Sequence, residues 1–299
     1  MIKEKPAWLK RFIDRLEAIR KNPAFSKGLR VVSIIYPLVL LYLSRNEILE
    51  LDWKSFSLLF LFSFLIFYVS MSLQNVNWSL IVDGNLRQFW LNSKIYFQTI
   101  LMKRLPGGVW HWLGRVNLYE NIQKDEQNSV SSANFIEWLI LILTGFAVYL
   151  STVNLLLGIF AAIACIGVCS WLITRQFGFK SKSVLLSMTV ILLYILCWLT
   201  GAAILHWLIR GVDPQTQLRF MDSLAAWSLS SAISMLVFFF PSGALLRDFS
   251  LGALLLNKIE PAKLVLLILQ VRIIFLAADF IWSFISLRFV NFILKPRQS

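Results

Sequence analysis

Residues 184–209, VLLSMTVILLYILCWLTGAAILHWLI, decide the fold class, because this run contains no Asp, Glu, Lys or Arg. A helix needs about 20 predominantly apolar residues to cross roughly 30 Å of hydrocarbon, so the run predicts a transmembrane helix. Similar apolar stretches occupy residues 29–44, 55–82, 133–150, 152–174 and 261–292. The sequence therefore predicts an all-α polytopic membrane protein with about six spanning helices.

The composition supports the membrane class and argues against several others. Apolar residues make up 58% of the 299 residues and charged residues only 15%, which is unusual for a soluble domain. The net charge of +13 sits in clusters, so it indicates membrane topology and attraction to anionic lipid headgroups rather than nucleic-acid binding. Neither a cofactor nor a metal is predicted, because the three cysteines lie in apolar runs and only two histidines are present.

Two apolar regions are each interrupted near the middle by a Pro-Gly-type turn. The breaks are Pro106-Gly107-Gly108 in residues 86–124 and Pro241-Ser242-Gly243 in residues 218–257. Proline and glycine end a helix and permit a sharp reversal. We therefore expect two re-entrant helical hairpins, which enter the membrane and return on the side they came from.

The half-helix after each turn is a predicted phosphate cradle. Its first amide groups have no helical partner, and they form the positive end of the helix dipole. Arg115 and Arg247 follow the two turns closely. The alternative is that the glycines only permit close packing of helices.

The positions of the basic residues predict the topology. Residues 1–28 form a basic amphipathic segment, read either as a helix on an anionic leaflet or as a tail without fixed structure. The positive-inside rule places this segment and the tail 295–299 in the cytoplasm, on either side of one transmembrane domain, 29–294. The expected location is the inner, cytoplasmic membrane of the cell, with the first hairpin entered from the cytoplasm and the second from outside.

The two hairpin regions share a spacing that predicts an internal repeat. Glu137 follows Pro106 by 31 residues (137 − 106), and Arg272 follows Pro241 by the same 31 (272 − 241). An odd number of crossings separates the hairpins, so repeat one (about 55–150) and repeat two (about 184–292) are predicted to have inverted topology. Many transporters build a midplane site between broken helices in this way.

Charges inside apolar segments are the remaining candidate site residues, since an ionised side chain at membrane depth costs several kcal/mol unless it is paired or wetted. Arg272 and Asp279 lie seven residues apart, on one face of the last helix. Arg247 and Asp248 are adjacent, so we expect them to point in different directions. Pairs of Arg115 with Glu137 and of Asp248 with Arg272 would leave each pair neutral. A structural ion pair and a substrate contact remain open for each residue.

These residues resemble a known family. Leu105-Pro106-Gly107-Gly108, Arg115 and Glu137 are similar to the first-half signature of the lysylphosphatidylglycerol synthase transmembrane-region, or flippase-like, family. Phe240-Pro241-Ser242-Gly243, Arg247-Asp248 and Arg272 resemble its second half. Ser242 departs from a glycine, and Asp248 from a glutamate. The chain lacks the aminoacyl-transferase domain of the bifunctional members, so aminoacyl transfer is not expected.

The resemblance implies a transporter for anionic phospholipids or polyprenyl-phosphate-linked lipids, with a role in cell-envelope or polysaccharide biosynthesis. Arg115, Arg247 and Arg272 would then contact the headgroup. Pro106, Gly107, Gly108, Pro241 and Gly243 would shape the turns, and Glu137, Asp248 and Asp279 would balance or gate charge. Two alternatives remain: a membrane transferase acting on a lipid-linked donor, and a scaffold that holds a glycosyltransferase. No catalytic residue is predicted.

Overall fold

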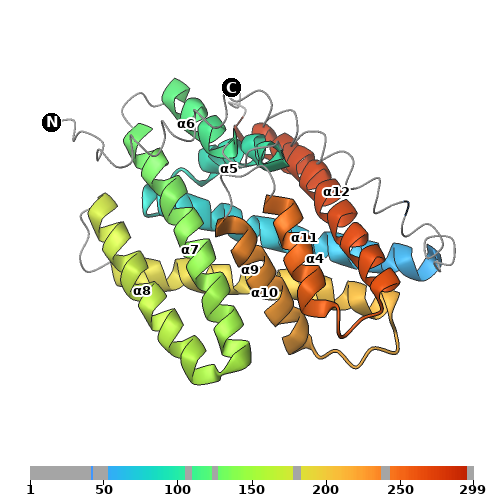
Figure 1. Ribbon diagram of the computed structural model, residues 1–299. Coiled ribbons are helices and arrows are strands. Elements are labelled where there is room, and N and C mark those ends of the chain that lie inside the picture. Colours follow the sequence, from blue (N-terminus) through green and yellow to red (C-terminus); the bar gives the residue numbers. More distant parts are fainter. Residues whose placement is uncertain are drawn as a thin grey trace, which may run out of the picture.

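The computed structural model describes residues 42, 53–104, 110–122, 127–177, 183–236 and 243–294. Every regular element in these ranges is helical (Figure 1). The predicted span at 29–44, apart from Tyr42, lies outside the described residues. So do the basic segment 1–28 and the tail 295–299.

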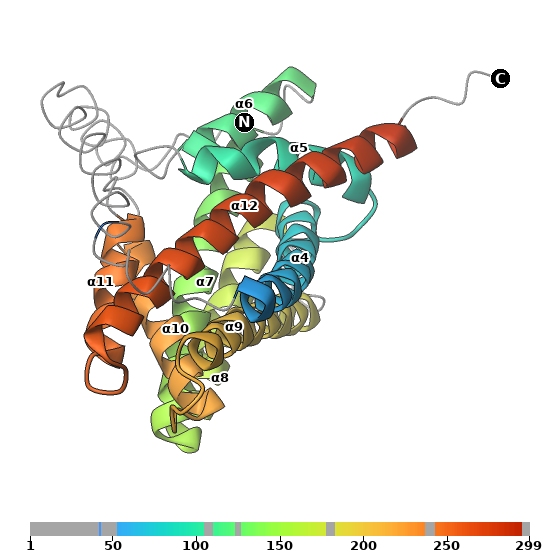
Figure 2. The same cartoon turned by 90° about the vertical axis from the view of Figure 1, so that its right-hand side faces the viewer.

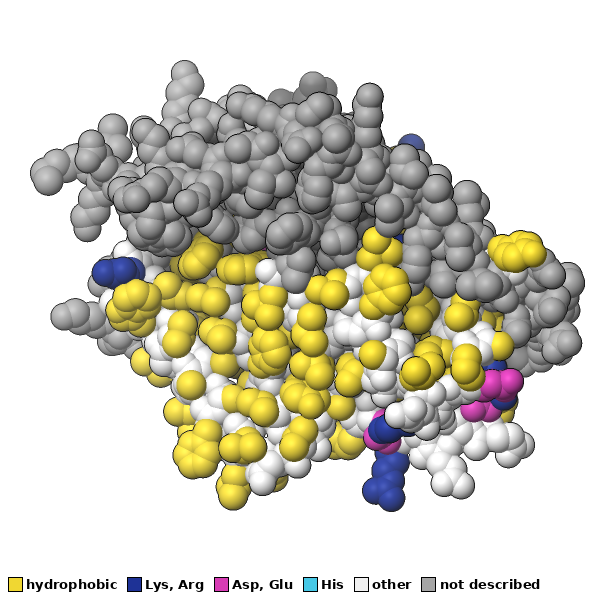
Figure 3. All heavy atoms as spheres, in the orientation of Figure 1, with side chains coloured by type: hydrophobic (Ala, Val, Ile, Leu, Met, Phe, Trp, Pro, Cys, Tyr) yellow, Lys and Arg dark blue, Asp and Glu magenta, His cyan; other side chains and the backbone are white. Residues whose placement is uncertain are grey.

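Five long helices confirm five of the predicted spans. They are α4 (Trp53–Asp83), α7 (Gln127–Val153), α8 (Leu155–Phe177), α9 (Ser183–Val212) and α12 (Pro261–Leu294). Each is long and apolar enough to cross a membrane, so the chain is a multi-pass membrane protein. In Figure 3, many apolar side chains lie on the described part of one face, and charged side chains lie toward its edges, as expected of a lipid-facing surface.

Each of the two interrupted regions forms a pair of shorter helices. The first pair is α5 (Phe89–Ile100) and α6 (Trp110–Ile122), with a short 3₁₀ turn, η1 (Leu101–Arg104), after α5. The second is α10 (Phe220–Leu236) and α11 (Gly243–Leu255). Within each pair the two helices pack against each other, so the predicted helical hairpins are present as helix pairs.

The packing of α4, α5, α6 and α7 recurs in α9, α10, α11 and α12 with the partners exchanged. Helix α5 packs on α12 as α10 packs on α7, and α6 contacts α7 as α11 contacts α12. Helices α4 and α9, which begin the two halves, pack along each other. In Figure 2, α12 runs obliquely from α11 to α5, so the last helix of the second half reaches the hairpin of the first. The two halves therefore interlock.

The corner between α7 and α8 takes a single residue, Asn154. Its Oδ1 accepts hydrogen bonds from the amides of Leu156 and Leu157, at 2.9 and 3.4 Å, and so caps the start of α8. A side chain at Gly158 would overlap Ser151 on the preceding helix. Capping and a glycine at the close approach together allow this tight reversal.

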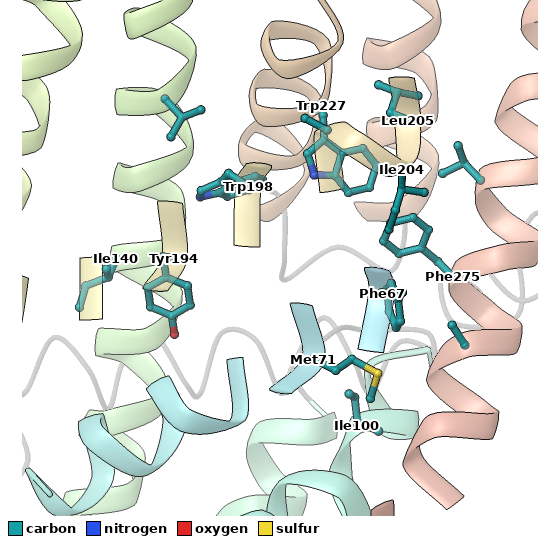
Figure 4. Close-up of a cluster of buried hydrophobic side chains, with 14 of the residues drawn as sticks. Phe67, Met71, Ile100, Ile140, Tyr194, Trp198, Ile204, Leu205, Trp227 and Phe275 are labelled. Atoms are coloured by element: carbon teal, nitrogen blue, oxygen red, sulfur yellow. The ribbon is translucent and has the colours of Figure 1, made fainter. Parts of the chain in front are cut away.

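Aromatic rings lie against small residues at the centre of the bundle. A Cβ at Gly201 of α9 would overlap the indole of Trp227 on α10, and one at Gly145 of α7 would lie 2.9 Å from Trp198. Trp227 also lies 5.1 Å from Phe275, centroid to centroid (Figure 4). In lipid there is no hydrophobic driving force between helices, because lipid tails are as apolar as the side chains. Helices there associate through close packing, which small residues permit.

Candidate functional site

Arg115 on α6 and Glu137 on α7 form an ion pair in the first half of the chain. The Arg115 side chain is 0% exposed and that of Glu137 is 6% exposed. Arg115 Nη1 binds Glu137 Oε2 and also donates to Asn134 Oδ1 at 3.2 Å. The predicted pair is confirmed, and it joins the second hairpin helix to the next long helix.

Two aromatic rings surround the same guanidinium. Its central carbon lies 3.9 Å from the ring centroid of Trp78 on α4 and 5.0 Å from that of Tyr96 on α5. A desolvated cation–π contact contributes on the order of 2 kcal/mol. Four helices therefore meet at Arg115.

One edge of the Arg115 guanidinium is unused. Nε and Nη2 are buried and have no hydrogen-bond partner in the part of the chain that the structure describes. These two nitrogens form the parallel fork that binds a carboxylate or phosphate through two hydrogen bonds. Glu137 and Asn134 bind Nη1 and so fix the orientation of the guanidinium. The N–H groups of Nε and Nη2 remain available as donors.

A chain of hydrogen bonds, not foreseen from the sequence, leads from Trp78 to the end of α4. Trp78 Nε1 donates to the Tyr119 hydroxyl at 3.3 Å, and that hydroxyl donates to Asn92 Oδ1 at 2.5 Å. Asn92 Nδ2 then donates to Asp83 Oδ2 at 2.6 Å. The sequence did contain a signal for this network, namely the asparagines at 75, 77 and 92 within otherwise apolar helices. Buried polar groups need hydrogen-bond partners.

Two buried tyrosines, Tyr96 and Tyr194, lie within electrostatic range of the Arg115–Glu137 pair. The Tyr96 hydroxyl donates to Gln74 Oε1 at 3.3 Å, and both Glu137 and Arg115 act electrostatically on Tyr96 and on Tyr194 of α9. The charge of Asp279 also acts on Tyr96. Asp279 therefore lies within electrostatic range of Tyr96, although it shares α12 with Arg272.

The second centre gathers three charged residues from α11 and α12. Arg272 Nε binds Asp248 Oδ2, which confirms that predicted pair. Arg247 Nε also lies 3.6 Å from Asp248 Oδ1, an ionic contact that was not expected of these two neighbouring residues. The Asp248 side chain is 0% exposed, whereas those of Arg247 and Arg272 are 13% and 19% exposed.

The two centres differ in charge. The first has one arginine and one glutamate, which sum to zero, whereas the second has two arginines and one aspartate, which sum to +1. Arg247 also lies 5.5 Å from the ring centroid of Trp227 and 5.6 Å from that of Phe275. The second centre is therefore the partly exposed, cationic one.

The turns themselves are only partly described. Pro106, Gly107, Gly108 and Pro241 lie outside the described residues, and Gly243 is the first residue of α11. The three cysteines are free and buried. Among the residues that the structure describes, no three His, Cys, Asp or Glu side chains gather as a metal site would require.

Comparisons of this chain with protein-family models, with curated proteins and with solved structures found no match.

Proposed function

We propose that this chain is a flippase-like transporter that binds an anionic phospholipid or a polyprenyl-phosphate-linked lipid and moves its headgroup across the membrane. The observation that carries the proposal is the pair of ionic centres, one in each half, each formed between the second helix of a hairpin and the following long helix. Ionised residues within membrane-spanning helices are rare and often mark a substrate pathway, whereas ion pairs in soluble proteins are common.

The chemistry of both centres suits a phosphate. The first offers the unused Nε and Nη2 donors of Arg115, and the second has an excess of one positive charge. Guanidinium groups are the preferred partners of phosphate because their fork donates two parallel hydrogen bonds. Acyl or prenyl chains would remain against the exposed apolar faces of the helices.

The difference in exposure suggests an order of events. The first centre is closed to solvent, whereas Arg247 and Arg272 are partly open. A headgroup would enter at the second centre in this conformation and reach Arg115 when the hairpins rearrange. In this proposal the hairpins are re-entrant and the halves have inverted topology in the cytoplasmic membrane, with both termini in the cytoplasm. Envelope or polysaccharide biosynthesis, with a glycosyltransferase as partner, is the expected setting.

The test is movement of fluorescent anionic lipids in vesicles that contain the purified chain, followed by quenching with dithionite from outside. We expect faster exchange than in empty vesicles, and its loss in Arg115→Ala/Arg272→Ala. Arg288→Ala is the matched control, since Arg288 lies on α12, stacks on Phe284 and belongs to neither ionic pair. Unchanged exchange in the double variant, with the fold intact, would refute the site. Chemical turnover of a lipid-linked donor would instead identify the transferase alternative.

A further inference from the structure

The buried carboxylate of Glu137 has a second role within the proposed lipid transport. We propose that Glu137 takes up a proton when a lipid phosphate binds to Arg115, so that each headgroup reaches the first centre together with one proton. The inference rests on the proposed function, to which it adds the coupled ion. The carboxylate oxygen gains the proton from solvent and no other bond changes, so charge balances between the entering anion and the entering proton.

The geometry lets phosphate and Glu137 share one guanidinium. Glu137 and Asn134 both use Nη1 of Arg115, whereas the fork of Nε and Nη2 is buried and meets no acceptor in the described residues. A phosphate that reached this centre after the hairpins rearrange could therefore bind the fork without displacing Glu137. The two anions would then lie on opposite edges of one cation.

The charge balance decides what happens next. Arg115 and Glu137 sum to zero, and a singly charged phosphate brings the centre to −1. An uncompensated charge in a buried, low-dielectric place is costly, and a titratable group there changes its protonation state instead. Protonation of Glu137 returns the sum for Arg115, Glu137 and the phosphate to zero.

The described neighbours on α5 and α9 do not balance this charge. Tyr96, whose ring centroid lies 5.0 Å from the Arg115 guanidinium, and Tyr194 and Cys197 bring hydroxyl and thiol groups, which carry no positive charge. Asp279 adds a further negative charge, which acts on Tyr96. Only Arg115 adds positive charge to this set.

The other helices packed around α7 supply no second cation at this place among the described residues. The nearest acid of α4 in the network is Asp83, three hydrogen bonds from Trp78. Asp222 of α10 is taken by Lys258, and Arg175 of α8 stacks on Trp171. On α6, His111 lies buried one helical turn before Arg115; it and the buried Asp279 are the rival proton acceptors.

The experiment counts protons as the full chain, in detergent, binds dihexanoyl phosphatidylglycerol. This phosphodiester keeps one charge near neutral pH, so any proton taken up belongs to the protein. Calorimetry at one pH, in two phosphate-free buffers that differ in ionisation enthalpy, gives the number. We expect about one proton per lipid in the wild type and in His111→Gln, and about none in Glu137→Gln, which should still bind.

Each outcome bears on a different claim. No lipid binding by the wild type overturns the proposed function, and the coupling with it. Binding without proton uptake overturns the coupling alone, and it needs only the wild type, even where Glu137→Gln does not fold. Uptake that persists in Glu137→Gln overturns the role of Glu137. Its loss in His111→Gln would then assign the proton to the histidine, and its persistence in both variants would point to Asp279.

Discussion

Glu137 and Arg272 occupy corresponding places in the two halves of the chain but carry opposite charges. Each lies on the long helix that follows a hairpin, and each binds a residue on the second helix of that hairpin, Arg115 or Asp248. The spacing from the preceding prolines is the same in the sequence. The contact between hairpin and long helix is thus ionic in both halves, with its polarity reversed.

Removing one member of the first pair should destabilise the protein more than removing both. Glu137→Leu leaves the Arg115 charge buried without its partner, and we expect a loss of about 3–5 kcal/mol. The double variant Arg115→Met/Glu137→Leu should recover most of that loss, since an apolar pair of similar volume is often neutral or stabilising. Unfolding in detergent measures both, and equal stability of the single and double variants would contradict a buried ionic contact.

Replacing Arg115 by lysine tests the guanidinium fork separately from its charge. Arg115→Lys keeps the cation but cannot donate two parallel hydrogen bonds. We expect lipid exchange in vesicles to fall about tenfold, equivalent to about 1.4 kcal/mol, with the helix content unchanged. Arg288→Lys on α12 is the control and should exchange lipid at the wild-type rate. Full exchange in Arg115→Lys would mean that charge alone suffices.

The contact between Gly201 and Trp227 predicts a sharp position effect among glycines. Gly201→Ala places a methyl group in the indole of Trp227, and overpacking of this kind costs about 1–3 kcal/mol. Gly167→Ala is the control, because a Cβ there meets nothing within 4 Å. Thermal unfolding in detergent should show a lower midpoint for Gly201→Ala only; equal midpoints would contradict the packing of α9 on α10.

The ion pair between Asp222 and Lys258 should make stability depend on acid pH. The hydrogen bond from Lys258 lowers the pKa of Asp222 in the folded protein. The pair therefore stabilises the fold above the unfolded pKa of about 3.9, and this is lost as pH falls through the lower, folded pKa. For a pair this exposed, the contribution is about 0.2–1 kcal/mol.

The comparison of wild type with Asp222→Asn across pH measures this contribution. The difference in melting midpoint should be constant near neutral pH and vanish in acid. Lys258→Met should show the same loss, since it removes the other partner. A difference that grows as pH falls would have the wrong sign for a carboxylate stabilised by a cation.

Much of the fold could be predicted from the sequence because the membrane limits the options. Five spans and both helix pairs follow from apolar length and from Pro-Gly breaks. The two ion pairs also followed, because charges within apolar helices need partners and only a few are present.

The detailed surroundings of the site could not be predicted. The hydrogen bonds from Trp78 through Tyr119 and Asn92 join residues of three helices, and their approach depends on packing rather than on local pattern. The contact of Arg247 with Asp248 was missed for a related reason. A long side chain can fold back toward its neighbour, although the two positions leave the helix in different directions.

Helix α8 belongs to neither set of four helices and packs mainly along α7 and α9. In the proposed topology each set crosses the membrane twice, so a second copy joined directly to the first would have the same orientation. One additional crossing turns the second copy over. On that topology, duplication of one four-helix unit with a single linking helix would yield two oppositely facing halves, and α8 occupies the place of that link.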